Sequence, residues 1–162
     1  MESINGLPAH PLFVHAPVVL MPLATIVTLV LAFRPTWRRR VGFALPAVAV
    51  VILALTQLAI SSGNAFDEIV GTRVNTDDHE SLALMTRNFI AVFVVASLLL
   101  ALFDRWHAKG GSGAAGSGVL LLVAVTTISS LLATTWMIRT GDEGARLVWD
   151  GILPADDDDG DG

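Results

Sequence analysis

The sequence contains no cysteine, and only 15% of its residues are charged. The absence of cysteine excludes disulfides, thiolate metal sites and iron–sulfur clusters. The sequence also lacks an HExxH motif, a nucleophile elbow and a glycine-rich phosphate cradle following a strand. It has no basic patch of the kind that binds nucleic acid. These absences disfavour the enzyme classes that such motifs identify, and they disfavour a nucleic-acid partner.

Hydrophobic residues make up 53% of the chain and are concentrated in blocks. Four runs reach the roughly 20 residues that a helix needs to cross a bilayer core. They cover residues 13–33, 41–60, 82–103 and 119–138. No polar face with a period of 3.6 residues is visible, as it would be in a soluble helix of this length. We therefore expect an all-α bundle of four transmembrane helices within residues 1–151, surrounded by the lipid bilayer.

The basic residues indicate the orientation of this bundle. The loops after the first and third runs carry six cations: Arg34, Arg38, Arg39, Arg40, Arg105 and Lys109. Only one carboxylate, Asp104, accompanies them on that side. The positive-inside rule places these loops in the cytoplasm and both termini on the extracytoplasmic side of the cell (inner) membrane. The first run lacks preceding positive residues and a small-residue cleavage site, so we expect a span there rather than a signal peptide.

The four runs divide into two tandem helical hairpins. A flexible glycine- and serine-rich linker at residues 109–118 separates the hairpins. The second helix of each hairpin ends in a hydroxyl residue followed by glycine, at Gly63 and Gly141. We expect these glycines to cap their helices in the left-handed conformation. The similarity of the two halves suggests a parallel repeat.

The extracytoplasmic connection between the hairpins is predicted to be long. Residues 61–81 form a loop in this interpretation, and its length is typical of functional loops. Asp77 and Glu80 at its end form a capping box that starts the third helix. The acidic run at 152–162 is expected to be a disordered tail.

Polar residues gather near the extracytoplasmic ends of the four runs, whereas the inner two thirds are almost wholly apolar. The residues concerned are His15, Gln57, Arg87, Thr134 and Thr135. A charged side chain at the bilayer centre costs about 2.5–3.5 kcal/mol on insertion scales, so an intramembrane arginine suggests a function. Alternatively, Arg87 snorkels to the surface and the amide and hydroxyl groups only join helices. The middle of the membrane lacks the charges that proton or ion transport would need.

The stretch "GLPAHPLFVHAPVVLMPLA" (Gly6–Ala24) holds two histidines and four prolines. Either the helix starts near Pro11 and bends at Pro17, or it starts at Pro17. Both alternatives place His15 at the extracytoplasmic membrane surface. His79, at the head of the third span, lies on the same side.

These histidines lead to three hypotheses for a small non-enzymatic membrane protein with a polar, histidine-containing pocket. In the first, His15 and His79 ligate one b-type haem for electron transfer, and Arg87 or Arg139 pairs with a propionate. The first hypothesis also includes a membrane-protein partner subunit, bound through His15, His79 and Arg87 in place of a cofactor. In the second, the chain is a structural or accessory membrane subunit without a cofactor, and its polar groups only hold helices together. In the third, His10, His15 and His79 bind a divalent metal on the outer face, although no i, i+4 histidine pair is present.

The same opening stretch resembles the signature of a bacterial membrane-domain family, domain of unknown function 2231. In that family a His-Pro pair, a second histidine and a following proline head the first of four spans. The matching positions are His10, Pro11, His15, Pro17, Gly63, His79, Gly141 and Gly144. The resemblance extends from about Gly6 to Gly151 and implies a four-helix inner-membrane domain of unassigned activity. Comparison with di-haem cytochrome b bundles is an analogy at the level of the fold, and His107 on the cytoplasmic side leaves ligands for at most one haem.

Overall fold

The structure, a computed structural model, describes residues 3–4, 7–70, 77–108 and 115–149, with side chains for 14–63, 78–106 and 117–146. The described helices are α1 (Ala9–Phe33), α2 (Pro35–Val41), α3 (Ala44–Val70), α4 (Asp77–Ala108) and α5 (Ala115–Trp149). Two short strands, β1 (Ser3–Ile4) and β2 (Leu7–Pro8), pair in antiparallel fashion ahead of α1.

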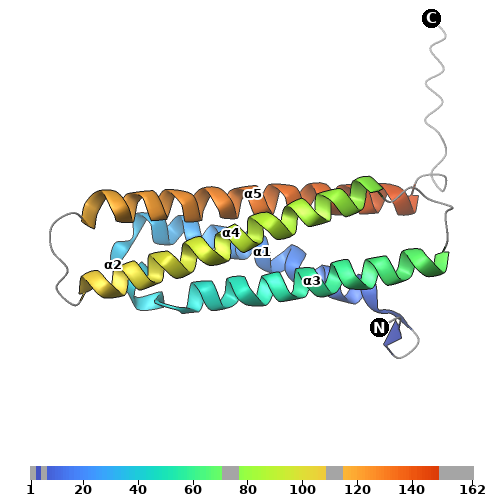
Figure 1. Cartoon of the computed structure of the whole chain (residues 1–162), viewed down its shortest axis with the longest axis horizontal. Coiled ribbons are helices and arrows are strands. Elements are labelled where there is room, and N and C mark those ends of the chain that lie inside the picture. Colours follow the sequence, from blue (N-terminus) through green and yellow to red (C-terminus); the bar gives the residue numbers. More distant parts are fainter. Residues whose placement is uncertain (1–2, 5–6, 71–76, 109–114, 150–162) are drawn as a thin grey trace, which may run out of the picture.

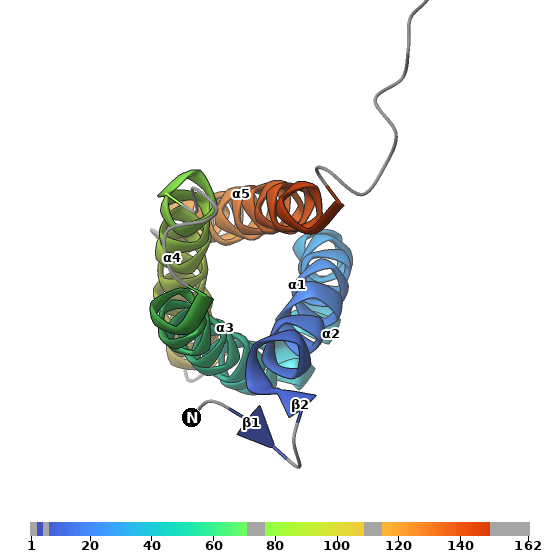
Figure 2. The ribbon, with the colours of Figure 1, turned by 90° about the vertical axis from the view of Figure 1, so that its right-hand side faces the viewer.

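The four long helices form a closed ring. Helix α1 packs against α3 and α5, and α4 packs against the same two helices, as the end-on view in Figure 2 shows. Successive long helices run antiparallel, so α1 begins and α5 ends at one end of the bundle, here called the termini end (Figure 1). The short helix α2 lies at the opposite end, here called the α2 end. The predicted all-α bundle of two hairpins is confirmed.

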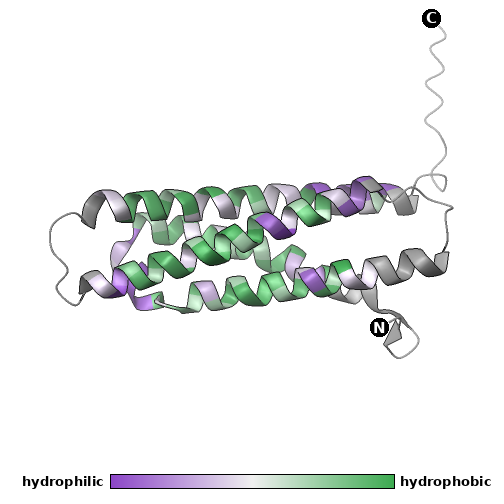
Figure 3. Ribbon diagram, viewed as in Figure 1, coloured by the Kyte–Doolittle hydropathy of each residue, from purple (hydrophilic) through white to green (hydrophobic). Residues whose placement is uncertain are grey.

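The surface of the bundle is apolar along most of its length (Figure 3). Large hydrophobic side chains such as Val19, Ile26 and Leu120 are more than half exposed. Within the described part of the chain, four helices are long and apolar enough to cross a membrane, over residues 14–33, 44–63, 78–106 and 117–146. Exposed side chains of this kind are stable in lipid and would be costly in water, so the prediction of a membrane protein is confirmed.

The helices extend beyond the predicted spans, and the predicted long loop at residues 61–81 is wrong. Helix α3 continues to Val70, and α4 begins at Asp77. Gly63 and Gly141 lie inside helices, so their predicted role as caps is also wrong. An interior glycine costs about 1 kcal/mol relative to alanine, which a long hydrogen-bonded helix tolerates. Among the described glycines, a positive φ occurs at Gly42, which ends α2.

The first helix settles the choice between the two alternatives for the proline-rich segment. Helix α1 begins at Ala9 and contains Pro17 and Pro22 in its interior, so a start at Pro17 is wrong. Each of these prolines leaves the carbonyl four residues earlier without its helical donor.

Several other predictions fall partly on residues that the structure does not describe. Helix α4 begins at Asp77, while the Asp77 side chain of the predicted capping box lies outside the described side chains. The acidic tail at 152–162 also lies outside the described residues. Of the predicted linker at 109–118, the last four residues belong to α5 and are therefore helical.

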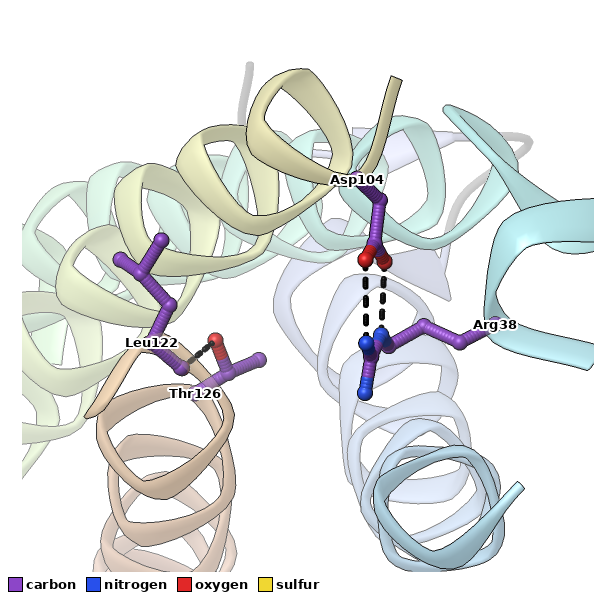
Figure 4. A network of polar contacts seen from close by, with 4 residues as sticks. All are labelled: Arg38, Asp104, Leu122 and Thr126. Carbon is purple, nitrogen blue, oxygen red and sulfur yellow. Dashed lines mark hydrogen bonds and ion pairs between the residues drawn. The ribbon is translucent and has the colours of Figure 1, made fainter. Parts of the chain in front are cut away.

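The interior of the bundle holds many hydroxyl groups. Those of Thr25, Thr28, Ser97 and Thr126 lie outside the extracytoplasmic third of the predicted runs, so the prediction of an almost wholly apolar inner two thirds is wrong. The buried hydroxyl residues include Thr25, Thr28, Thr56, Thr86, Ser97, Thr126, Ser129 and Ser130. Most of them donate to a carbonyl of their own helix; the Thr126 hydroxyl, for example, lies 2.7 Å from the Leu122 carbonyl oxygen (Figure 4). This bond satisfies the hydroxyl without a partner helix, and it lets threonine and serine sit in an otherwise hydrophobic run.

Candidate functional site

A group of polar side chains lies on the outside of the bundle where α3 and α4 meet. The Arg87 Nη1 donates to Gln57 Oε1 at 3.4 Å, and Nη2 donates to Asn88 Oδ1 at 3.3 Å. Gln57 Nε2 in turn lies 3.4 Å from Ser61 Oγ. Gln57, Ser61 and Asn88 are exposed, and Arg87 is half-buried. We call these four residues the polar face.

The depth of Arg87 follows from the helix geometry. A hydrocarbon core about 30 Å thick corresponds to roughly 20 residues of helix. If the core begins near Asp104 at the α2 end, it extends along α4 to about Leu84. Arg87 then lies roughly 4–5 Å inside the core, at 1.5 Å per residue. Hydrophilic turns interrupt the hydrophobic surface of α3 and α4 in this part of the bundle (Figure 3).

The guanidinium of Arg87 has no carboxylate within 4 Å among the described side chains. Those side chains form two ion pairs, Arg38–Asp104 and Arg146–Asp142. Its contacts are neutral amide oxygens at the long end of the hydrogen-bond range. The positive charge of Arg87 is therefore solvated by dipoles and is not neutralised by this part of the chain.

Arg139 is a second cation at the termini end with no carboxylate within 4 Å in the described part of the chain. Its guanidinium carbon lies 4.5 Å from the centre of the Trp136 ring. Trp136 stacks on Phe89, with 6.3 Å between the ring centres. This cation–π contact joins Arg139 to the interface of α4 and α5. The pairing of Arg87 or Arg139 with a haem propionate stays a prediction.

The two candidate haem ligands lie on helices that are diagonal in the ring. His79, on α4, is half-buried against α5: a Cβ atom added to Gly144 would lie 3.0 Å from His79 Cε1. His15, on α1, is exposed. The glycine at position 144 thus makes room for the imidazole of His79. Both residues are among the positions that carry the family resemblance, and the structure places them in contact. The ligation of haem by this pair stays a prediction.

The proposed metal site needs His10, whose side chain is outside the described side chains. Among the side chains that are described, no group of three histidine, cysteine or acidic residues is arranged to bind a metal ion. The metal hypothesis is therefore also a prediction.

Three of the interior hydroxyl contacts join different helices. Thr25 of α1 lies 2.8 Å from the Thr134 hydroxyl of α5 and donates to the Ser130 carbonyl at 3.0 Å. Thr86 and Thr140 join α4 to α5 at 3.0 Å. The predicted joining of helices is thus confirmed for Thr134. The neighbouring Thr135 is exposed and donates only to a carbonyl of its own helix.

An ion pair at the α2 end was missed by the sequence analysis. Arg38 Nε donates to Asp104 Oδ2 at 2.6 Å, and Nη2 donates to Oδ1 at 3.0 Å (Figure 4). Both side chains are less than a tenth exposed. The sequence signal was the solitary carboxylate among six cations, but helix α2, which positions Arg38, was not predicted.

Comparison with protein families matches residues 6–154 to the family described as predicted membrane protein DUF2231. No curated protein and no solved structure matches the chain. The family match covers nearly the whole sequence, and it agrees with the four apolar helices of the structure. The chain belongs to the DUF2231 family of predicted membrane proteins.

Proposed function

We propose that this protein is a non-catalytic membrane subunit that binds a transmembrane helix of a partner protein at the polar face. The observation that carries this proposal is the placement of Arg87 within the candidate span 78–106, on the outside of the bundle, with amide contacts and no carboxylate within 4 Å among the described side chains. A partner helix with an aspartate or glutamate at this depth would neutralise the guanidinium and exclude lipid from it.

Small side chains on the surface of α3 next to Arg87 also support the binding of a partner helix. Ala47, Ala54 and Ser61 are exposed and recur at intervals of seven residues, so they lie along one side of the helix. Small side chains on a lipid-facing stripe allow a second helix to approach closely, and amide groups beside them add hydrogen bonds between helices. Gln57 lies between Ala54 and Ser61 and contributes such an amide.

Site-specific photocrosslinking in native membranes tests the proposal. The crosslinking amino acid replaces Leu58, which is exposed beside Gln57, or Val19, which is similarly exposed on α1. We expect the Leu58 position to give an adduct with one other membrane protein. Arg87→Leu should abolish this adduct and Arg87→Lys should retain part of it, because lysine keeps the charge.

Two outcomes would contradict the proposal. An adduct that forms equally from the Val19 position, or that persists in Arg87→Leu, would show that the polar face does not direct the contact. An adduct between two copies of this chain would show that the polar face mediates self-association and does not bind a different protein.

A second candidate is a single b-type haem held by His15 and His79. It is favoured by the half-buried imidazole of His79 and by two arginines at the same end, Arg87 and Arg139. Neither arginine has a carboxylate within 4 Å among the side chains that the structure describes. We expect a Soret band in the purified protein that is lost in His15→Ala and in His79→Ala. A colourless protein that retains its helical circular dichroism in both variants would exclude this candidate.

A further inference from the structure

A cavity of about 220 Å³ lies at the α2 end, among residues of α1, α2, α3 and α4. Its polar lining consists of Arg38, Arg39, Arg105 and Asp104 with Ser97. The apolar lining includes Leu31, Leu45 and Leu100, which are buried. The cavity therefore combines cationic groups with a hydrophobic floor at the end of the membrane-spanning region.

The charges that line this cavity do not balance. Asp104 is fully engaged by Arg38 through two hydrogen bonds. Arg39 and Arg105 are exposed and have no carboxylate within 4 Å among the described side chains. Arg105 lies 5.6 Å from the centre of the Phe43 ring, which holds its guanidinium at the cavity. Two guanidiniums that line the cavity are thus available to an anion, and arginine is a common partner of phosphate groups.

The size of the cavity limits what it can hold. Pockets for drug-sized ligands and cofactors are larger, at about 300–1,000 Å³. A phosphate ester with part of a glycerol unit is compact enough, and longer chains attached to it would continue along the apolar surface of the bundle.

We propose that this cavity binds the headgroup of an anionic phospholipid, with Arg39 and Arg105 contacting the phosphate. The Arg38–Asp104 pair holds α2 against α4 and so forms the wall of the site. Inorganic phosphate shares the charge but not the acyl chains, and the apolar outer surface of the bundle favours the lipid. Basic pockets between transmembrane helices bind such headgroups by the same forces. The proposal concerns the α2 end alone and does not depend on the function proposed for the polar face.

Native mass spectrometry of the purified protein in detergent with a small fraction of phosphatidylglycerol tests this assignment. The test variant is Arg39→Gln/Arg105→Gln. The matched control is Arg34→Gln/Arg40→Gln, which removes two exposed cations from the same end but none from the cavity lining. We expect wild type and control to retain one phosphatidylglycerol, and the test variant to bind it at least tenfold more weakly. Phosphatidylcholine should not be retained in this way.

Three outcomes would overturn the proposal. Equal losses in the test and control variants would indicate unspecific attraction by surface charge. Displacement of the lipid by millimolar inorganic phosphate would assign the site to free phosphate. Unchanged retention in Arg39→Gln/Arg105→Gln, with thermal stability equal to wild type, would place the bound lipid elsewhere.

Discussion

Each end of the bundle holds an arginine, but the surroundings of the two side chains are opposite. At the α2 end, Arg38 is buried and bound to Asp104 by two hydrogen bonds of 2.6 and 3.0 Å. At the termini end, Arg87 is half-buried and contacts amide oxygens at 3.3 and 3.4 Å. The first charge is neutralised within the chain. The second is only partly solvated, and so it retains affinity for a group outside the chain.

The physical difference lies in what each arginine gains from its partners. A bidentate ion pair in a low-dielectric site makes two strong, charge-assisted hydrogen bonds. Long contacts to neutral amides at an exposed site contribute little to stability, because lipid headgroups or water can replace them. We therefore expect the arginine at the α2 end to stabilise the fold, and Arg87 at the termini end to act in binding. Substitutions at Asp104 and Arg87 test this division directly, and substitutions at the helix interfaces should have effects of intermediate size.

Removal of the carboxylate at the α2 end should destabilise the protein most. Asp104→Ala leaves the buried guanidinium of Arg38 without a partner, and breaking a buried ion pair in this way costs about 3–5 kcal/mol. The free energy of unfolding can be measured by titration with SDS in mixed micelles. The double variant Arg38→Leu/Asp104→Leu removes both charges and should recover much of the loss. If Asp104→Ala left the free energy of unfolding unchanged, the ion pair at the α2 end would not stabilise the fold, and the contrast with Arg87 would be lost.

The interface of α4 and α5 at the termini end offers a sharper test at a pair of glycines. In Gly144→Ala the new methyl group would lie 3.0 Å from His79 Cε1, whereas at Gly141 nothing lies within 4 Å. Both substitutions gain helix propensity, but in Gly144→Ala the imidazole must move, so we expect Gly144→Ala to be about 1 kcal/mol less stable than Gly141→Ala. Gly141→Ala should stabilise by roughly 0.5–1 kcal/mol through helix propensity alone.

The same unfolding titration checks both glycine variants. His79→Ala in the Gly144→Ala background removes the clashing ring and should recover stability relative to Gly144→Ala. Equal effects of the two glycine substitutions would mean that His79 does not pack against α5 as described.

The sequence was sufficient to predict the class of the protein, because the bilayer imposes a length and composition that are visible in any transmembrane run. It did not predict where the helices end. Gly63 and Gly141 have the residue type of a cap, but a glycine terminates a helix only when the following chain turns away, and here both helices continue.

The candidate site was predicted only in part. Arg87 and Gln57 were singled out as polar residues of similar depth, and the structure joins them. Their position on the outside of the bundle was not predictable, because a run without amphipathic periodicity does not show which side faces the interior. The pairing of Arg38 with Asp104 depends on α2, a single short helix beyond the hydrophobic run, and on contacts between residues 66 positions apart.

Hydrogen bonds between helices in the interior should have a smaller effect than the ion pair. Thr25→Val removes the contact of Thr25 with Thr134 and with the Ser130 carbonyl. We expect a loss of about 1 kcal/mol, in the range measured for hydrogen bonds within membranes. The control Thr135→Val changes an exposed threonine that bonds within its own helix, and its effect should stay below about 0.5 kcal/mol. If Thr135→Val costs as much as Thr25→Val, the hydroxyl contact between α1 and α5 does not stabilise the bundle.

Substitution of Arg87 should have the smallest effect on the stability of the isolated protein. Its result decides most directly whether the arginines at the two ends have different roles. Arg87→Leu removes two long contacts from a site where leucine suits the surrounding lipid, so the free energy of unfolding should change by less than about 0.5 kcal/mol. The same substitution should nevertheless abolish the adduct formed from position 58, since the partner helix would lose its cation. A loss of several kcal/mol, similar to that of Asp104→Ala, would instead make Arg87 part of the internal framework. Both ends of the bundle would then use arginine for stability, and the polar face would have no charge to offer a partner.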